Sequence, residues 1–277
     1  MQEKDAPRLA ASSYLNTAPL VWSFTHGSMR SRVELLTDAA PARCALMLER
    51  GLADVALVPV IEYGRMENVL VVPDVCVGSR GRVRSVVLAT RLKDLKSVRT
   101  IALDASSRTS ATLIQIIFRE FLGLAPECKA SAPDLRAMLE ESDAALIIGD
   151  PAMTFPREDL YVHDLATLWR EHTGLGFVFA MWMARGDAIE RVRGVNFARA
   201  RDEGLEHVEE IVGLYQQKLD LPREELREYL LKNISFELDA LMRAGLELYF
   251  ELAQKHGFIE SFKSLRMLEA SNISEHG

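Results

Sequence analysis

The chain has 277 residues, 48% hydrophobic and 26% charged, as expected for an ordinary globular protein with one large or two medium domains. Its net charge of −7 and the lack of a basic stripe argue against nucleic-acid binding, and its apolar runs are too short to span a membrane. The 3 cysteines are scattered and match no disulfide or metal pattern, and the charged N-terminal segment lacks a signal-peptide core, so we expect a cytoplasmic protein.

Short β-type runs alternate with helical patterns up to Ala184, an order that is typical of α/β architecture. A helix is predicted over Ala39–Arg50, where Gly51 ends it. Another is predicted to begin around Ser110, with one apolar face and Gly123 as its stop. The predicted strands are Arg8–Ser12, Val33–Leu36, Asp54–Val60, Val69–Val72, Ser85–Thr90, Thr100–Asp104 and Ala144–Ile148.

The chain changes character after the apolar run Phe177–Ala184. From Asn196 onward the apolar residues recur at helical spacing. Pro222 is predicted to open the next helix, and Ser235 is predicted to be the N-cap of the last long one. Residues 269–277 are predicted to form a frayed tail.

Unusual polar residues follow several of the predicted strands. Ligands of open α/β sheets bind outside the carboxyl ends of the strands, and three of the four polar groups fall there. Two of these residues also have a purely local explanation, because Asn16 can form an Asx turn and Asp150 can form a turn before Pro151. The four groups are Tyr14-Leu-Asn-Thr17, Ser85, Ser107-Arg-Thr-Ser110 and Gly149-Asp150.

The second of the predicted helices begins with the segment Ser107, Arg108, Thr109 and Ser110. Backbone N–H groups lack partners at a helix N-terminus, where the helix dipole is positive. Hydroxyl and guanidinium groups at this position favour a binding site for a carboxylate or a phosphate. A simple N-cap by Ser107 or Thr109 is the alternative, but one cap needs only one hydroxyl.

Six segments of the chain resemble the chorismate dehydratases in order and spacing. These enzymes act in the futalosine route to menaquinone. The resemblance covers nearly the whole chain, and the C-terminal YLLKNISFELDALMRAGLELYF is similar to the closing helices of that family. The six segments are YLNTAPLVW (Tyr14–Trp22), GLADVALVPVIEY (Gly51–Tyr63), SVVLA (Ser85–Ala89), LDASSRTSATL (Leu103–Leu113), ALIIGD (Ala145–Asp150) and HDLATLWREHTGLGFVFAMW (His163–Trp182).

The resemblance implies a two-lobed fold of the periplasmic-binding-protein type II class, with a ligand cleft between the lobes. Residues 1–90 and 180–277 would form the first lobe, and residues 91–179 the second. The implied reaction is loss of water from chorismate, which gives 3-[(1-carboxyvinyl)oxy]benzoate. Aromatisation drives this elimination, so no metal, nucleotide or redox cofactor is expected, and the implied partner is a small-molecule substrate.

The implied catalytic residues are Asn16, which would orient or polarise the departing hydroxyl, and Asp150. The sequence leaves two candidates for the proton acceptor: Asp150 in a closed cleft, or the enolpyruvyl carboxylate of the substrate itself. The implied substrate-binding residues are Tyr14, Thr17, Ser85, Ser107, Arg108, Thr109, Ser110 and Gly149.

Two other functions remain open at this point. The same fold serves non-catalytic modules that bind small acids, and fold alone does not decide between binding and catalysis. The sister enzyme of the pathway, dihydroxynaphthoate synthase, shares the fold but usually has a Pro-Asn-Asp type motif after its first strand. This chain has Leu15-Asn16-Thr17 there, which favours the dehydratase. The sequence does not predict an oligomeric state.

Overall fold

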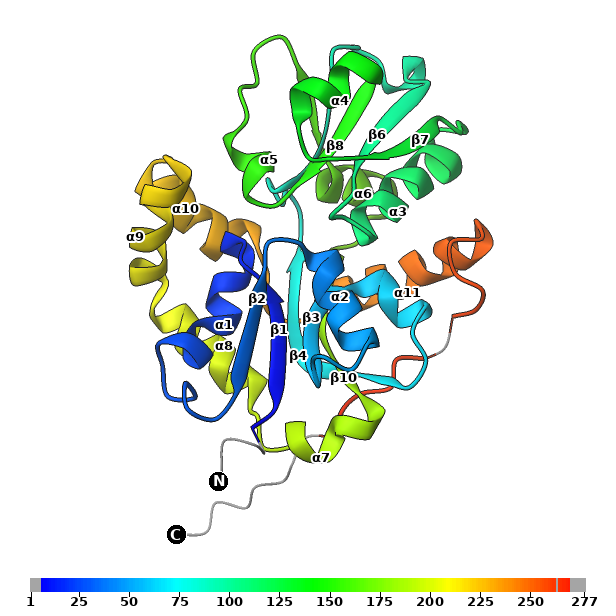
Figure 1. The fold of residues 1–277 in the computed structure, drawn as a ribbon. Helices are drawn as coiled ribbons and strands as arrows, with labels where there is room; N and C mark the ends of the chain where they lie inside the picture. Colours follow the sequence, from blue (N-terminus) through cyan, green and yellow to red (C-terminus); the bar gives the residue numbers. More distant parts are fainter. Residues whose placement is uncertain (1–5, 263, 270–277) are drawn as a thin grey trace.

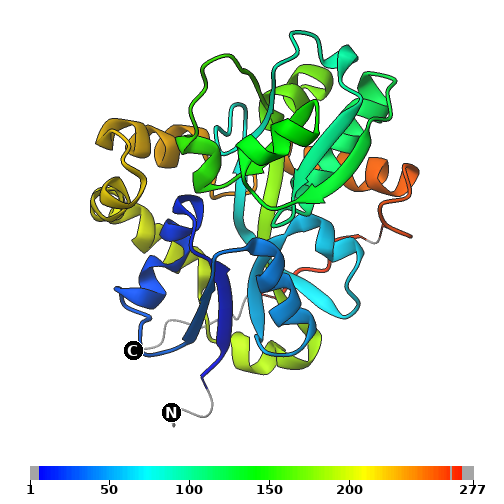
Figure 2. The same ribbon diagram turned by 45° about the horizontal axis from the view of Figure 1, so that its top comes forward.

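A computed structural model describes residues 6–262 and 264–269, which form two lobes, each built on one β-sheet (Figure 1). The second lobe lies above the carboxyl end of the first strand (Figures 1 and 2). Residues 270–277 of the predicted tail lie outside the described part of the chain. No helix in that described part is long and apolar enough to cross a membrane.

The two sheets have five strands each and share one plan. The strands are β1 (Arg8–Ser12), β2 (Glu34–Asp38), β3 (Val55–Pro59), β4 (Val69–Ser79), β5 (Val86–Thr90), β6 (Thr100–Asp104), β7 (Glu127–Ser131), β8 (Ala144–Ile148), β9 (Tyr161–Asp164) and β10 (Phe177–Arg185). The first sheet has the order β2-β1-β3-β10-β4, and the second has the order β7-β6-β8-β5-β9. In each sheet three strands run parallel, and a fourth strand returns antiparallel between them and the edge.

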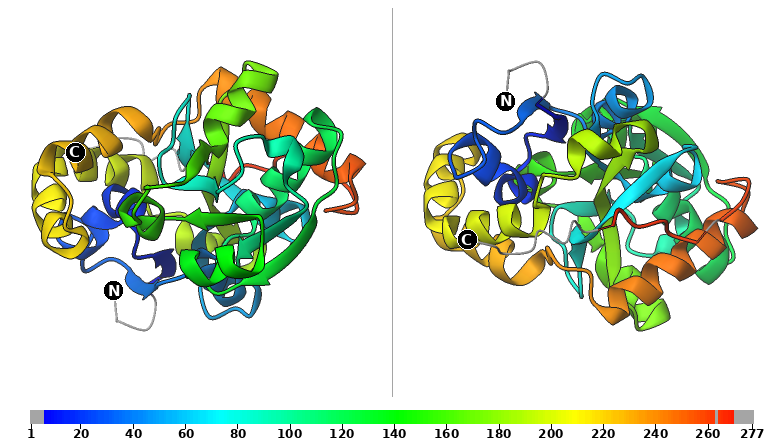
Figure 3. Two further views of the ribbon diagram at one scale, coloured as in Figure 1. Left: turned by 90° about the horizontal axis from the view of Figure 1, so that it is seen from above. Right: turned by 90° about the horizontal axis from the view of Figure 1, so that it is seen from below.

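Helices surround both sheets. They are α1 (Ala18–Thr25), α2 (Pro41–Glu49), α3 (Thr109–Ile116), α4 (Leu135–Glu141), α5 (Asp150–Thr154), α6 (Leu165–Thr173), α7 (Ile189–Val192), α8 (Phe197–Glu206), α9 (Val208–Leu219), α10 (Arg223–Glu228) and α11 (Ala240–Lys255). Two π-helical turns, Ile117–Phe121 and Tyr229–Asn233, continue α3 and α10. Helix α8 packs against α1, and α11 packs against β10. Helices α9 and α10 lie on the opposite side of the first lobe from α11 (Figures 1 and 3).

The strand predictions are most accurate where the strands are buried. The bounds of β1, β6 and β8 are those predicted, and their inner residues are buried. Strand β4 continues to Ser79, beyond the predicted end at Val72. The predicted strand was too short because Pro73 and Asp74 interrupt the apolar pattern, at an irregularity in the pairing with β10. Strands β7 and β9 were not predicted, because these edge strands consist of exposed and half-buried residues without apolar alternation.

The boundaries between the two sheets do not fall at residues 90 and 180, where the lobe boundaries were expected. Strand β5, which was expected in the first lobe, pairs with β8 and β9 in the second sheet. Residues 177–179, which were expected in the second lobe, belong to β10 of the first sheet. Both segments are continuous apolar runs, which do not indicate the sheet they join. The chain therefore crosses between the lobes at residues 80–85 and again at residues 174–176.

The first crossing segment is held in place by the end of β9 and by α6. The carboxylate of Asp164 accepts the backbone N–H groups of Val83 and Arg84 at 3.0 and 2.6 Å. The guanidinium of Arg170 donates to the carbonyl oxygen of Arg80 at 2.6 Å. These contacts fix the backbone just before β5, where the polar residue Ser85 lies.

One predicted helix start is wrong and another is confirmed. Helix α11 is capped by Asp239, whose carboxylate accepts the backbone N–H of Met242 at 2.8 Å. Ser235 instead exchanges backbone hydrogen bonds with Gly78 of β4. A Ser before an apolar run predicts an N-cap, but Ser235 pairs with strand β4 instead. Asn196 does cap α8, since its side chain accepts the N–H of Arg199.

Candidate functional site

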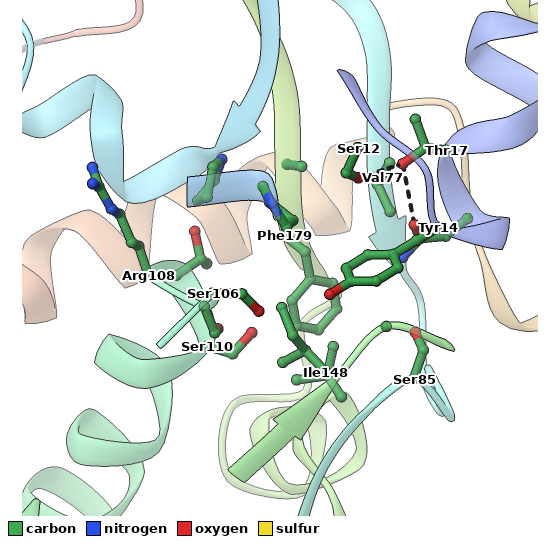
Figure 4. Close-up of a pocket in the computed structure, with 18 of the residues that line it drawn as sticks. Ser12, Tyr14, Thr17, Val77, Ser85, Ser106, Arg108, Ser110, Ile148 and Phe179 are labelled. Carbon is green, nitrogen blue, oxygen red and sulfur yellow. Dashed lines mark hydrogen bonds between the residues drawn. The ribbon is translucent and has the colours of Figure 1, made fainter. Parts of the chain in front are cut away.

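A cavity that is partly open to solvent lies between the lobes (Figure 4). It is formed where β1, β3 and β8 end, where β5 begins, and beside the middle of β10. The floor is apolar and consists mainly of Leu57, Val77, Val86, Ile148 and Phe179. The polar wall consists of Ser12, Tyr14, Asn16, Thr17, Ser85, Ser106, Ser107, Arg108, Thr109 and Ser110.

The turn after β1 forms the polar wall on the first-lobe side. A short 3₁₀ turn, Leu15–Thr17, buries Leu15 and Thr17 and leaves Asn16 half-buried at the cavity. The Thr17 hydroxyl lies 3.0 Å from that of Ser12 and donates to Oδ1 of Asn16 at 3.3 Å. The side chain of Asn16 is therefore held by a neighbouring side chain, and the Asx turn that was its local alternative is not formed in the described chain.

Tyr14 packs against Gly149, which belongs to the second lobe. Gly149 has φ +67° and ψ −150°, a backbone conformation that is essentially restricted to glycine. A Cβ atom at this position would lie 2.6 Å from Cε2 of Tyr14, so only glycine admits the ring. Burial raises the pKa of Tyr14, and a hydrogen bond with Ser106 opposes this rise. The Tyr14 hydroxyl points toward the hydroxyl groups at the start of α3 (Figure 4).

The start of α3 brings several hydrogen-bond donors to the cavity. The buried carboxylate of Asp104 accepts the N–H and the hydroxyl of Ser106 at 2.8 and 2.6 Å, which fixes the turn. The hydroxyls of Ser107 and Ser110 have no partner among the described residues. The N-cap position is Arg108, and no side chain caps the helix, so the alternative of a simple cap is wrong. Free hydroxyls and a helix N-terminus suit a carboxylate.

Arg108 and Thr109 make contacts across the cleft. The guanidinium of Arg108 donates to the buried carboxylate of Glu62 at 2.7 Å and extends away from the centre of the cavity (Figure 4). The hydroxyl of Thr109 accepts the N–H of Ile61 at 3.4 Å, and its carbonyl oxygen accepts the hydroxyl of Tyr249 at 3.0 Å. The two residues line the cavity, but their polar groups hold the lobes together.

Asp150 also bridges the lobes, and it does not line the cavity. One carboxylate oxygen accepts the backbone N–H of Leu15 at 2.8 Å, and the other accepts the ammonium of Lys218 at 3.2 Å. Burial raises the pKa of Asp150, and these two contacts oppose the rise. Both carboxylate oxygens thus accept hydrogen bonds from the first lobe, and we call such a contact between the lobes a latch.

Ser85 is fully buried and lines the cavity from the crossing segment. Its Oγ atom accepts the hydroxyl of Tyr229 at 2.7 Å. Burial raises the pKa of Tyr229 above its ordinary range, and the hydrogen bond with Ser85 opposes the rise. Tyr229 therefore contacts Ser85, one of the predicted site residues.

The cavity is almost free of ionisable groups. Among the described residues that line it, only Arg108 carries a charge at neutral pH, and that charge is paired with Glu62. No histidine, cysteine, aspartate or glutamate of the described chain lines it. The described residues also contain no group of three or more such side chains that could hold a metal ion. The arrangement can bind a small anion through neutral donors.

A family model described as menaquinone biosynthesis matches residues 7–255 of the chain. The chain belongs to this family. The chorismate dehydratase of Thermus thermophilus is 29% identical over 262 residues, which cover 88% of this chain and 93% of that protein. The resemblance predicted from the sequence motifs is therefore confirmed.

Solved structures of known proteins share the fold of this menaquinone-biosynthesis family member. Protein AF1704 from Archaeoglobus fulgidus aligns with a TM-score of 0.68 at 17% identity, covering 93% of this chain and 100% of that chain. The periplasmic aliphatic sulphonate-binding protein SsuA from Escherichia coli aligns with a TM-score of 0.64 at 15% identity, covering 99% and 96%. The predicted two-lobed, periplasmic-binding-protein-like α/β fold is confirmed.

Several residues of the site in this family member were not predicted from the sequence. Ser106 precedes the predicted anion segment and was passed over, although it lies in the same polar run. The apolar floor lies within buried strands, where nothing in the sequence marks a cavity. Tyr229 and Lys218 come from the C-terminal helices, and their contacts with Ser85 and Asp150 span 144 and 68 residues. No local pattern identifies such distant partners.

Proposed function

We propose that the protein is a chorismate dehydratase, a hydro-lyase that converts chorismate to 3-[(1-carboxyvinyl)oxy]benzoate in the futalosine route to menaquinone. The family and the similarity to the Thermus thermophilus enzyme support this proposal. The observation that carries it is the cavity itself, in which neutral hydroxyl, amide and N–H donors surround an apolar floor. A six-membered ring with two carboxylates needs both kinds of surface.

We assign the ring carboxylate of chorismate to the start of α3. The free hydroxyls of Ser107 and Ser110 and the N–H groups of the first helical turn would donate to it. Ser85 would bind the enolpyruvyl carboxylate from the opposite wall, while Tyr14, Thr17 and Gly149 shape the space around the ring. In this assignment Arg108 and Thr109 close the lobes over the substrate, which excludes water from the site.

We propose that the enolpyruvyl carboxylate of the substrate removes the C3 proton. The electron pair of the C3–H bond moves toward the ring carboxylate, where the donors of α3 stabilise the developing charge. The C3–C4 double bond then forms as the C4–O bond breaks, and the departing hydroxide takes up the proton that the enolpyruvyl carboxylate removed, so that water leaves. Asn16 would donate to that departing hydroxyl through its amide.

This assignment is preferred to Asp150 as the base. Asp150 does not line the cavity, and its oxygens accept the Leu15 N–H and the Lys218 ammonium. A general base must come within hydrogen-bond reach of the proton that it removes. The role proposed for Asp150 is therefore to hold the lobes closed. Aromatisation of the ring supplies the driving force, so the reaction needs no cofactor.

A non-catalytic binding module for a small aromatic acid is the second candidate. The lack of aspartate, glutamate and histidine in the described cavity lining favours it, because a receptor needs no proton acceptor. Dihydroxynaphthoate synthase activity is a further alternative from the sequence, and its larger substrate would need a roomier cavity.

The experiment that tests the proposal follows purified protein and chorismate by mass and by ultraviolet spectrum, beside the Asn16→Ala variant. The proposal expects a product lighter by one water with a benzenoid spectrum, and a rate at least about a hundredfold lower in the variant. Unchanged chorismate together with tight binding of it would contradict the enzyme and favour the binding module. Conversion at the same rate in the variant would remove Asn16 from the mechanism.

A further inference from the structure

Tyr229 occupies an unusual place in the C-terminal helices. Its side chain is 1% exposed and lies at the first position of the π-helical turn Tyr229–Asn233. Short π-helical turns within α-helices are frequent at functional sites, because the extra residue re-aims a side chain. Here the turn aims a phenol from the first lobe at the crossing segment, where it meets Ser85.

The Tyr229 hydroxyl is the donor in its hydrogen bond with Ser85. A neutral phenol has one proton, and the Tyr229 hydroxyl donates it to Oγ of Ser85 at 2.7 Å. The Ser85 hydroxyl then still has its own proton. Within the described residues it has no acceptor for that proton, and it lines the cavity.

We propose that Tyr229 is a positioning residue that turns the hydroxyl of Ser85 into a donor toward a carboxylate of the substrate. Tyr229 does not line the cavity, so it acts through Ser85. The inference rests on the proposed function for the identity of the ligand. It assigns the donor direction from the protein alone.

The test uses a cycle of variants: Tyr229→Phe, Ser85→Ala and the double variant. Tyr63→Phe is the control, because the Tyr63 hydroxyl is also buried but bonds to the carbonyl oxygen of Ser264 and the N–H of Arg266, away from the cavity. For each protein we would measure kcat and KM with chorismate, the Kd of 3-[(1-carboxyvinyl)oxy]benzoate by calorimetry, and urea unfolding.

Loss of one directed hydrogen bond should lower kcat/KM and the affinity for the product about tenfold in Tyr229→Phe, and by a similar factor in Ser85→Ala. The double variant should be no more than about threefold worse than Ser85→Ala alone, since Tyr229 acts through Ser85. Tyr63→Phe should change unfolding only.

Three results would overturn the inference. If Tyr229→Phe matches Tyr63→Phe in affinity and rate, the role of Tyr229 is structural. If the effects of Tyr229→Phe and Ser85→Ala multiply in the double variant, the two residues act independently. If the wild-type protein neither binds the product nor consumes chorismate, the proposed function fails, and the inference fails with it. The first two results leave the proposed function intact.

Discussion

The contact between Gly149 and Tyr14 allows a quantitative prediction for Gly149→Ala. Gly149 has φ +67° and ψ −150°, where a non-glycine residue costs about 3 kcal/mol, the upper end of the range for strained backbone. The new Cβ would also lie 2.6–2.7 Å from three atoms of the Tyr14 ring, so the ring must leave its position on the cavity wall. A displacement of this size at a substrate-positioning group lowers the rate by about a hundredfold.

Gly174→Ala is the matched control. Gly174 has φ +72° and ψ 0°, and a Cβ there would meet no atom within 4 Å. This substitution should cost about 1 kcal/mol of unfolding free energy and leave chorismate turnover unchanged. Urea unfolding and kcat/KM would be measured for both variants. If Gly149→Ala were no less stable than Gly174→Ala and as active as wild type, the argument from Tyr14 would be refuted.

Two further predictions concern buried carboxylates. Asp150→Asn keeps the shape of the latch but weakens the contact with Lys218, so kcat/KM with chorismate should fall by less than about tenfold, whereas loss of a general base costs roughly 10²–10⁴-fold. A loss in that larger range would restore Asp150 as the base. Burial raises the pKa of Asp104 above its ordinary 3.8. The folded state therefore binds more protons between the two values, and its stability falls as pH rises through that window. Asp104→Asn should remove this part of the slope in urea unfolding followed against pH, and a steeper fall in the variant would contradict the sign.

The sequence predicts the buried strands of this fold better than the edge strands. Strands β6 and β8 are short apolar runs with turn residues on both sides, and their bounds follow directly. Strand β7, Glu127–Ser131, is largely exposed, and its backbone pairing with β6 is what makes it a strand. The sheet that β5 joins depends on its pairing with β8, which begins more than fifty residues later in the chain.

In the candidate site too, local sequence patterns were predictable and contacts with distant residues were not. The position of the polar residues at strand ends was predictable, because parallel strands bring their carboxyl ends together. The direction of each side chain was not, because it depends on distant partners. Arg108 is drawn toward Glu62, which is 46 residues away, and Asp150 toward Lys218, which is 68 residues away. The sequence marks both as binding or catalytic residues, whereas their contacts are those of cross-lobe latches.

The central claim is that the substrate, and not a side chain of the cavity, removes the C3 proton. The most direct test compares chorismate with an analogue in which the enolpyruvyl carboxylate is replaced by a carboxamide. The account predicts that the analogue binds within about tenfold of chorismate, since one hydrogen-bonded charge is lost, while its turnover falls at least about a hundredfold. Turnover of the carboxamide at the rate of chorismate would contradict the account and require a proton acceptor on the protein.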